Sequence, residues 1–228
     1  MRRAALFVLL LLAVAVPSRA EVFCPANARA GKLQALDCLI DCAFSSEYGS
    51  PNSILLRWKD PIYVYAGGSP TKEDLRQLDS FLMELSFRVP LLPPVERVPA
   101  PETANLTVYF VPEARMGDYV KNYVSGNWGF VTYYYTDCVI NRAEAAVASD
   151  VTSQKQRNGI IREEIVNGIG LGNDHFRYED SIIYEPYNET ETLSEVDWLM
   201  LNMVYSPFTH PGMSADEAYR ALKSEILK

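Results

Sequence analysis

Histidine, the commonest metal-binding side chain, is almost absent from this sequence. The 228 residues include two histidines, His175 and His210, and four cysteines, none of which forms a CxxC pair. Structural zinc sites are usually built from cysteine and histidine at short, recurring spacings. The sequence therefore predicts no zinc site assembled from its cysteines.

Clusters of basic residues are also absent. Lysine and arginine total 21 against 29 aspartate and glutamate residues, which gives a net charge of −8, and no segment concentrates the basic residues. An acidic surface repels the phosphate backbone of nucleic acids and the head groups of anionic lipids. We therefore expect no nucleic-acid partner and no attraction to anionic membranes.

Several common catalytic signatures are missing as well. The chain has no G-x-S-x-G nucleophile elbow and no glycine-rich phosphate loop after a strand, and it contains no internal repeat. Glu163 and Glu164 are adjacent, so on a helix their side chains diverge by about 100° and cannot face one another across a glycosidic bond. These absences argue against a serine hydrolase, a nucleotide-binding protein and a glycosidase.

Long hydrophobic runs are absent, with one exception at the N-terminus. The apolar run Ala4–Val16 follows two arginines and precedes the small residues Ser18 and Ala20. This order is typical of a signal peptide, and the run is shorter than the roughly 20 residues that a membrane-spanning helix needs. We expect residues 1–20 to be cleaved and residues 21–228 to form a single domain, secreted or periplasmic, without a transmembrane span.

The four cysteines suggest disulfide bonds, because an even number is typical of exported proteins. Cys38 and Cys42 lie four residues apart on an expected helix, and we expect each to face a different partner. The favoured arrangement links Cys24 to one of them and Cys138 to the other, although all three connectivities stay open. Residues 21–50 are then an N-terminal helical segment tethered by a disulfide.

The hydrophobic periodicity predicts an α+β fold, with helices packed on a twisted mixed sheet. Capping boxes are expected at Thr71, Thr192 and Ser214, and the proline-rich stretch 89–101 is expected to be an extended connection. The expected strands are 55–58, 62–65, 106–111, 130–135 and 145–148, and the expected helices are 32–44, one opening at 71, 154–169, 196–205 and 214–226.

Residues 163–174 resemble the active-site motif of the metzincin metallopeptidases, H-E-x-x-H-x-x-G-x-x-H-D. Glu164 falls on the general-base glutamate, Gly170 on the glycine that turns the chain, and Asp174 on the acidic residue after the third ligand. Met213 follows a helix that ends in an aromatic residue, which resembles the metzincin Met-turn. The resemblance implies that this methionine forms an apolar floor beneath the site.

The three ligand positions of this motif hold Glu163, Asn167 and Asn173 in place of histidine. Residues four apart share a helix face, and the glycine turn returns the third position to the same place. Because neutral amide oxygens are poor zinc ligands, we expect a metal-free cluster in which both amides donate to Glu163. Two metal sites stay open as alternatives. Calcium accepts oxygen ligands and could use Glu163, Asn167, Asn173 and Asp174. A rebuilt transition-metal site could use Glu163, Glu164, His175 and His210.

Segments along most of the chain carry a second resemblance. They are Arg57-Trp58, Gly67-Gly68, Glu163-Glu164, 170–174, Asp180-Ser181, Asp197 and Pro211-Gly212-Met213. With these the chain resembles a group of exported bacterial proteins, the domain-of-unknown-function family 2927. That family typically has glutamine at the position of Asn167, and it has no established activity.

Together the resemblances imply an exported pseudoenzyme, a metzincin-like protein without zinc ligands that serves as a binding or envelope-associated domain. Its partner would be a peptide, a protein or a glycan. Tyr133 and Tyr135 are expected on one face of a strand and Tyr134 on the other. In metzincins the edge strand borders the cleft and pairs with an extended peptide, so these tyrosines are candidates to line a groove.

Two other functions stay open from the sequence. The first is an atypical metal-dependent hydrolase that uses Glu164 as its general base, which requires a zinc or calcium site. The second is a purely structural component of the cell envelope. Bound metal distinguishes the hydrolase from the binding domain, and a groove beside Glu164 distinguishes the binding domain from a structural component.

Overall fold

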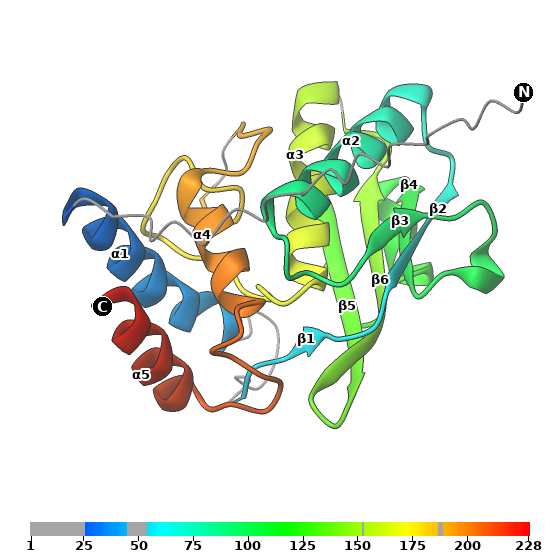
Figure 1. Cartoon of the computed structure of the whole chain (residues 1–228). Coiled ribbons are helices and arrows are strands. Elements are labelled where there is room, and N and C mark those ends of the chain that lie inside the picture. Colours follow the sequence, from blue (N-terminus) through cyan, green and yellow to red (C-terminus); the bar gives the residue numbers. More distant parts are fainter. Residues whose placement is uncertain (1–25, 45–53, 152, 187–188) are drawn as a thin grey trace, which may run out of the picture.

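A computed structural model describes residues 26–44, 54–151, 153–186 and 189–228. The expected signal peptide and Cys24 lie outside these residues. The described part is an α+β structure in which helices cover one face of a sheet and three further helices pack beside it (Figure 1). Among these residues no helix combines the length and apolar character that a bilayer span requires. The predicted α+β fold class is confirmed.

Among the described residues the sheet has six strands, and every pairing but one is parallel. Its order is β1-β6-β4-β2-β3, and β5 joins β6 in the one antiparallel pairing. β5 therefore forms an edge of the sheet. The strands are β1 (Arg57–Trp58), β2 (Ile62–Gly68), β3 (Val95–Arg97), β4 (Leu106–Val111), β5 (Gly129–Thr136) and β6 (Val139–Ala148).

In the described part of the chain, α2 and α3 cover one face of the sheet, and α1, α4 and α5 form a neighbouring group (Figure 1). The main core lies between the sheet and the covering helices, where β4 contributes Leu106, Val108 and Phe110 at alternating positions. Val111 belongs to a smaller core on the other face. The covering helices are α2 (Lys72–Arg88) and α3 (Gln154–Gly168), and the neighbouring group is α1 (Ala26–Ala43), α4 (Glu195–Val204) and α5 (Ala215–Ile226).

Helix α3 ends where the sequence predicts, at a glycine turn. Gly170 adopts a positive φ of 127°, which is accessible to glycine at little cost. The last carbonyl groups of the helix are buried and accept hydrogen bonds from distant side chains. Trp58 Nε1 donates to the Gly168 carbonyl at 3.0 Å, and Tyr205 Oη donates to the Ile169 carbonyl at 2.6 Å. This end of α3, which leads into the motif loop, is thereby fixed.

Some predicted elements differ in their bounds. The capping boxes at Thr71 and Ser214 are confirmed, but the cap of α4 is Ser194 with Asp197, not Thr192. The proline-rich stretch 89–101 contains the short strand β3, which pairs with β2. A strand of three residues is too short to show an alternating hydrophobic pattern, and its pairing with a distant segment cannot be read from the local sequence. This strand was therefore not expected.

Candidate functional site

A cleft lies between the edge strand β5 and helix α3. It consists of two adjoining cavities of about 210 Å³ and about 370 Å³. Residues from β5, from α3 and from the loop after α3 line it. The residues common to both cavities are Asn127, Gly129, Glu163, Glu164 and Asp174. Three of these five were singled out by the metzincin-like motif.

Glu164 is the buried carboxylate of the cleft, with 5% of its surface exposed. Its side chain lies directly against the backbone of β5. A Cβ atom added at Gly129 would lie 2.1 Å from Glu164 Oε1, far inside van der Waals contact. Glycine at position 129 therefore creates the space that the carboxylate occupies, a role that the sequence does not reveal.

Asn167 contributes a buried acceptor to the same cleft. It lies one turn after Glu163 on α3 and lines the smaller cavity. Its Oδ1 atom has no hydrogen-bond partner among the described residues, and 9% of the residue is exposed. A buried polar atom without a partner is costly, so this covered oxygen adds polarity to the wall of the cleft at the expense of stability.

The structure does not bring Asn173 into this cluster. The Asn173 amide donates to the carbonyl of Asp174 at 2.8 Å and to the carbonyl of Asp41 on α1 at 3.3 Å. The expectation that both amides donate to Glu163 is therefore wrong for Asn173. The reason is tertiary, because α1 packs beside the loop and offers its carbonyl group as the acceptor.

Met213 lines neither cavity. Its carbonyl accepts from the Leu55 amide at 2.7 Å, and its Sδ atom accepts from the His210 amide at 3.2 Å. The methionine is buried in the main core. The structure thus does not place this side chain on the lining of the cleft, where the Met-turn resemblance puts an apolar floor.

The tyrosines of β5 divide between the two faces, as expected for Tyr133 and Tyr134. Tyr133 lines the smaller cavity and packs against Gly172, where an added Cβ would lie 2.6 Å from its hydroxyl oxygen. Tyr134 donates to Glu144 Oε2 at 3.0 Å on the opposite face. A register shift between Tyr134 and Tyr135 interrupts the alternation, and Tyr135 lies half exposed outside the cleft.

The charge of the cleft is negative. Glu163, Glu164 and Asp174 line both cavities, and Glu185 lines the larger one. No lysine or arginine of the described chain lines either cavity. A ligand that carries positive charge is therefore favoured over an anion.

The motif positions do not fit a metzincin zinc ion. Asn173 is turned toward α1, and Asn167 offers an amide oxygen. Among the described residues, the carboxylates of the cleft do not form a group of three or more that lie close enough together to share a metal ion. Zinc requires three or four convergent nitrogen, sulfur or carboxylate ligands. Of the three ligand positions, only position 163 holds a carboxylate, that of Glu163, so the requirement is not met.

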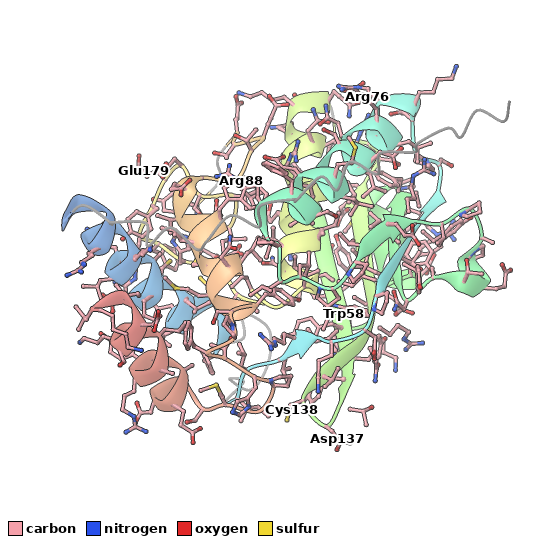
Figure 2. The ribbon with its side chains drawn as sticks, in the orientation of Figure 1. Trp58, Arg76, Arg88, Asp137, Cys138 and Glu179 are labelled. Atoms are coloured by element: carbon pink, nitrogen blue, oxygen red, sulfur yellow. The ribbon has the colours of Figure 1, made fainter. Side chains whose placement is uncertain are left out.

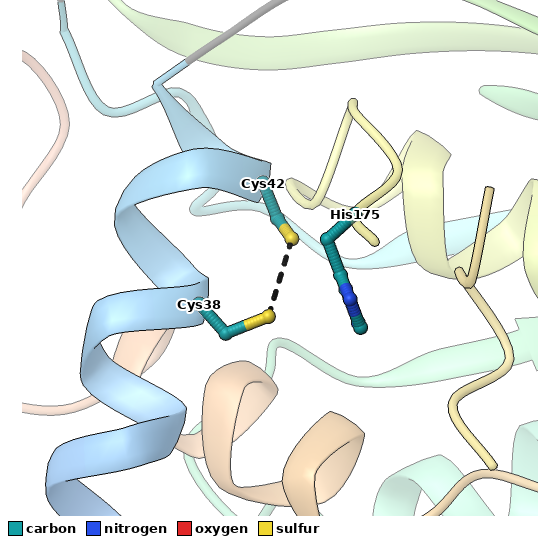
Figure 3. Close-up of side chains that lie close together, drawn as sticks. All are labelled: Cys38, Cys42 and His175. Atoms are coloured by element: carbon teal, nitrogen blue, oxygen red, sulfur yellow. Dashed lines mark hydrogen bonds between the residues drawn. The ribbon is translucent and has the colours of Figure 1, made fainter. Parts of the chain in front are cut away.

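A second polar cluster involves the cysteines. The sulfur atoms of Cys38 and Cys42 lie 4.0 Å apart on one face of α1, and His175 lies beside them (Figure 3). The expectation that the two cysteines face different partners is therefore wrong. Successive helical turns place them on the same side, as the four-residue spacing dictates.

Cys138 is not part of this cluster, and no disulfide joins the cysteines of the described residues. Figure 2 labels Cys138 next to Asp137 in the turn between β5 and β6. Its sulfur would lie 3.4 Å from a Cβ added at Gly212, on the segment before α5. The expected link between Cys138 and a cysteine of α1 is therefore not present.

The two thiols of α1 have opposite pKa shifts. The hydrogen bond from Cys42 lowers the pKa of Cys38 to about 6, although burial opposes this shift and His175 adds to it. The same hydrogen bond, together with burial, raises the pKa of Cys42 well above its ordinary value. Cys38 is thus the thiol that ionises first.

Comparison with known proteins gives a family without an assigned activity. The family model described as "Protein of unknown function (DUF2927)" matches residues 34–224, which include the cleft and both cysteines of α1. No curated protein matches the chain. The function must therefore be inferred from the geometry of the chain itself.

Proposed function

The chain belongs to the DUF2927 family, and we propose that its cleft binds an extended, positively charged peptide without hydrolysing it. One observation carries this proposal: buried and partly buried carboxylates line a cleft whose wall is an edge strand. An edge strand offers backbone hydrogen bonds to an extended chain, and the pockets beside it select side chains.

The edge strand supports the extended form of the ligand. Within the described residues β5 pairs with one strand, β6, and residues 129–133 line the smaller cavity. A peptide added beside β5 would carry every second side chain toward α3. Those side chains would approach Glu163 and Glu164.

The charge of the cleft supports a cationic ligand. Lysine and arginine side chains offer several N–H donors and no acceptor. Such a group would lie near the carboxylates of Glu164 and Asp174, which line the same cavity. An anionic side chain at the same place would meet like charge.

In this proposal the cleft does not hydrolyse the peptide, because the zinc-ligand positions of the motif lack histidine. A peptidase of this kind needs a metal to lower the pKa of the attacking water, and the base glutamate accepts the proton. Asn167 and Asn173 supply amides where ligand histidines are needed, so Glu164 has no activated water to deprotonate. Its carboxylate instead becomes part of the binding surface.

The metzincin-like ancestry and the export of the protein belong to the same proposal. The order of the strands leading into α3, the glycine turn at Gly170 and an edge strand that borders the cleft all agree with the resemblance. The apolar run near the N-terminus supports a secreted or periplasmic location. If the leader is removed as proposed, mass spectrometry of the protein recovered from its native host will give a chain that begins at Glu21.

Peptide binding can be tested with two matched probes. Fluorescein-labelled hexapeptides that alternate valine with lysine, or valine with glutamate, are titrated with the full chain and followed by fluorescence anisotropy. We expect the lysine peptide to bind and the glutamate peptide not to bind. Glu164→Gln should weaken binding about tenfold, which corresponds to about 1.4 kcal/mol.

The control for this experiment is Glu102→Gln, which removes an exposed carboxylate of the 3₁₀ turn after β3. It should bind the lysine peptide like the unmodified chain. Equal binding of both peptides, or equal effects of the two substitutions, would contradict the proposal. Zinc-dependent cleavage of the lysine peptide that Glu164→Gln abolishes would instead establish the metal-dependent hydrolase.

A further inference from the structure

A cluster outside the cleft gathers three metal-binding side chains in the core. Cys38 and Cys42 come from successive turns of α1, and His175 comes from the loop after α3 (Figure 3). One ligand atom from each residue lies within 4.8 Å of the other two, and all three residues are buried. Thiolate and imidazole are the ligands that zinc prefers.

The distance between the sulfur atoms favours chelation over a disulfide. Two zinc–sulfur bonds of about 2.3 Å at a tetrahedral angle place the sulfurs about 3.8 Å apart, close to the observed 4.0 Å. A disulfide needs Cβ atoms about 3.5–4.5 Å apart, whereas residues four apart on a helix have Cβ atoms about 5–6 Å apart. The helix therefore holds the two sulfurs at a suitable distance for a shared cation.

Hydrogen bonds fix the tautomer of His175. The Ser181 hydroxyl donates to Asp197 Oδ1 at 2.5 Å, so the ring Nε2 atom must be the donor in its 3.0 Å contact with Ser181 Oγ. The Nδ1 atom is then the unprotonated nitrogen, and its lone pair accepts from the Arg177 amide at 3.0 Å. Zinc-bound histidines commonly donate their other ring N–H to such a second group.

We propose that Cys38, Cys42 and His175 bind one Zn²⁺ ion that joins α1 to the loop after α3. Coordination through Nδ1 exchanges the contact with the Arg177 amide for a metal bond and keeps the hydrogen bonds through Ser181 to Asp197. Two thiolates neutralise Zn²⁺, whereas a monovalent cation would leave a net charge buried. No fourth side chain of the described residues joins this group, so the fourth position falls to a water molecule.

This site is independent of the proposed peptide binding, but it affects the same loop. Asp174 precedes His175 directly and lines both cavities of the cleft. The metal therefore stabilises the loop that supplies one of the cleft carboxylates. Its role is structural, since it holds two distant segments together.

The proposal is tested on the full chain, kept reduced by a phosphine. Co²⁺ serves as the spectroscopic probe and Zn²⁺ as its competitor. We expect one Co²⁺ per chain, the charge-transfer absorption of cobalt bound to thiolate, and its displacement by one equivalent of Zn²⁺. Zn²⁺ should also raise the thermal midpoint, because it binds the folded chain. Ser181→Ala should keep the absorption but lower the affinity about 10- to 100-fold.

Matched variants identify the ligands. In Cys42→Ser and in His175→Asn, the thiolate absorption or the stoichiometric binding of Co²⁺ should be lost. The control variants Cys138→Ser and Cys24→Ser should keep both the absorption and the stoichiometry. Failure of the reduced, unmodified chain to bind Co²⁺ would overturn the proposal without any variant. Binding that survives Cys42→Ser, or a Cys38–Cys42 disulfide in the protein isolated from its native host, would also overturn it.

Discussion

At the scale of single residues, Gly129 decides where the Glu164 carboxylate lies. Because a side chain at this position would overlap both Glu164 and Ile160, Gly129→Ala must displace both of them or shift the strand itself. We expect the substitution to cost about 1–3 kcal/mol in the free energy of unfolding, as overpacking does, and to weaken binding of the lysine peptide.

The matched control for this change is Gly117→Ala. An added Cβ there would meet Tyr123 at 3.5 Å, an ordinary contact. Urea unfolding should therefore give nearly the same stability for Gly117→Ala as for the unmodified chain. Equal destabilisation by both substitutions would show that the contact between Gly129 and Glu164 has no special importance.

Asp74 gives the structure a defined dependence on pH. Burial by itself raises the pKa of Asp74, but hydrogen bonds from Gln154, Thr71 and Arg157 together lower it below the ordinary value. Arg157 Nε lies 2.8 Å from the carboxylate, and both side chains are largely buried. The ion pair connects the start of α2 with the start of α3.

The lowered pKa predicts when this contribution disappears. It is fully present above about pH 4, the ordinary pKa of an unfolded aspartate, and is lost as the pH falls through the lower folded value. Asp74→Asn should cost about 3 kcal/mol near neutral pH, since it breaks a buried pair, and should lose less further stability in acid. Urea unfolding at several pH values measures the loss of stability near neutral pH and the further loss in acid. If the stability of Asp74→Asn fell in acid as much as that of the unmodified chain, this account would be contradicted.

At the scale of elements, the N-caps of α3 and α4 differ in the hydrogen bonds that stabilise the start of each helix. Ser194 accepts a hydrogen bond from the Asp197 amide, and Asp197 accepts in return from the Ser194 amide, so α4 begins with a complete capping box. Ser153 occupies the corresponding position before α3, but its side chain makes no capping hydrogen bond.

This difference provides a matched pair of substitutions. Ser194→Ala should lower the free energy of unfolding by about 1 kcal/mol, the usual contribution of an N-cap side chain. Ser153→Ala should change it by only a few tenths of that amount. Thermal or urea unfolding of the two variants measures the difference, and equal effects would show that the capping contacts do not stabilise α4.

The sequence predicted some elements with the observed bounds and others only in part. Residues 106–111 form β4 as expected, because alternating apolar side chains over six residues give a clear strand pattern. The expected strand 145–148 is only the end of β6, since Val139 to Arg142 include polar residues that face solvent. A helix or strand that carries its own periodicity is thus predictable, whereas a segment stabilised mainly by its neighbours is not.

At the scale of the whole molecule, the negative charge should govern peptide binding. The chain carries a net charge of −8, and the cleft adds carboxylates at the point of contact. Salt screens such interactions, with a Debye length of about 10 Å at 0.1 M ionic strength. Affinity for the lysine peptide should therefore fall as sodium chloride is raised, mainly through a slower association rate.

Stopped-flow anisotropy at several salt concentrations measures this association rate. A rate that does not change with salt would mean that apolar contacts, not charge, direct the peptide to the cleft. The Glu102→Gln chain serves as the control for total charge, because it removes one negative charge away from the cleft. Its association rate should depend on salt as that of the unmodified chain does.

The sequence by itself determined the helices and strands that carry their own periodicity, the glycine turn at Gly170 and the acidic character of the motif. These depend on local spacing, since the order of side chains along a helix or strand decides which of them share a face. Only the tertiary structure decided that Asn173 turns toward α1 and that His175 lies beside Cys38 and Cys42. Contacts between distant segments depend on how the helices and loops pack, and no local pattern encodes that packing.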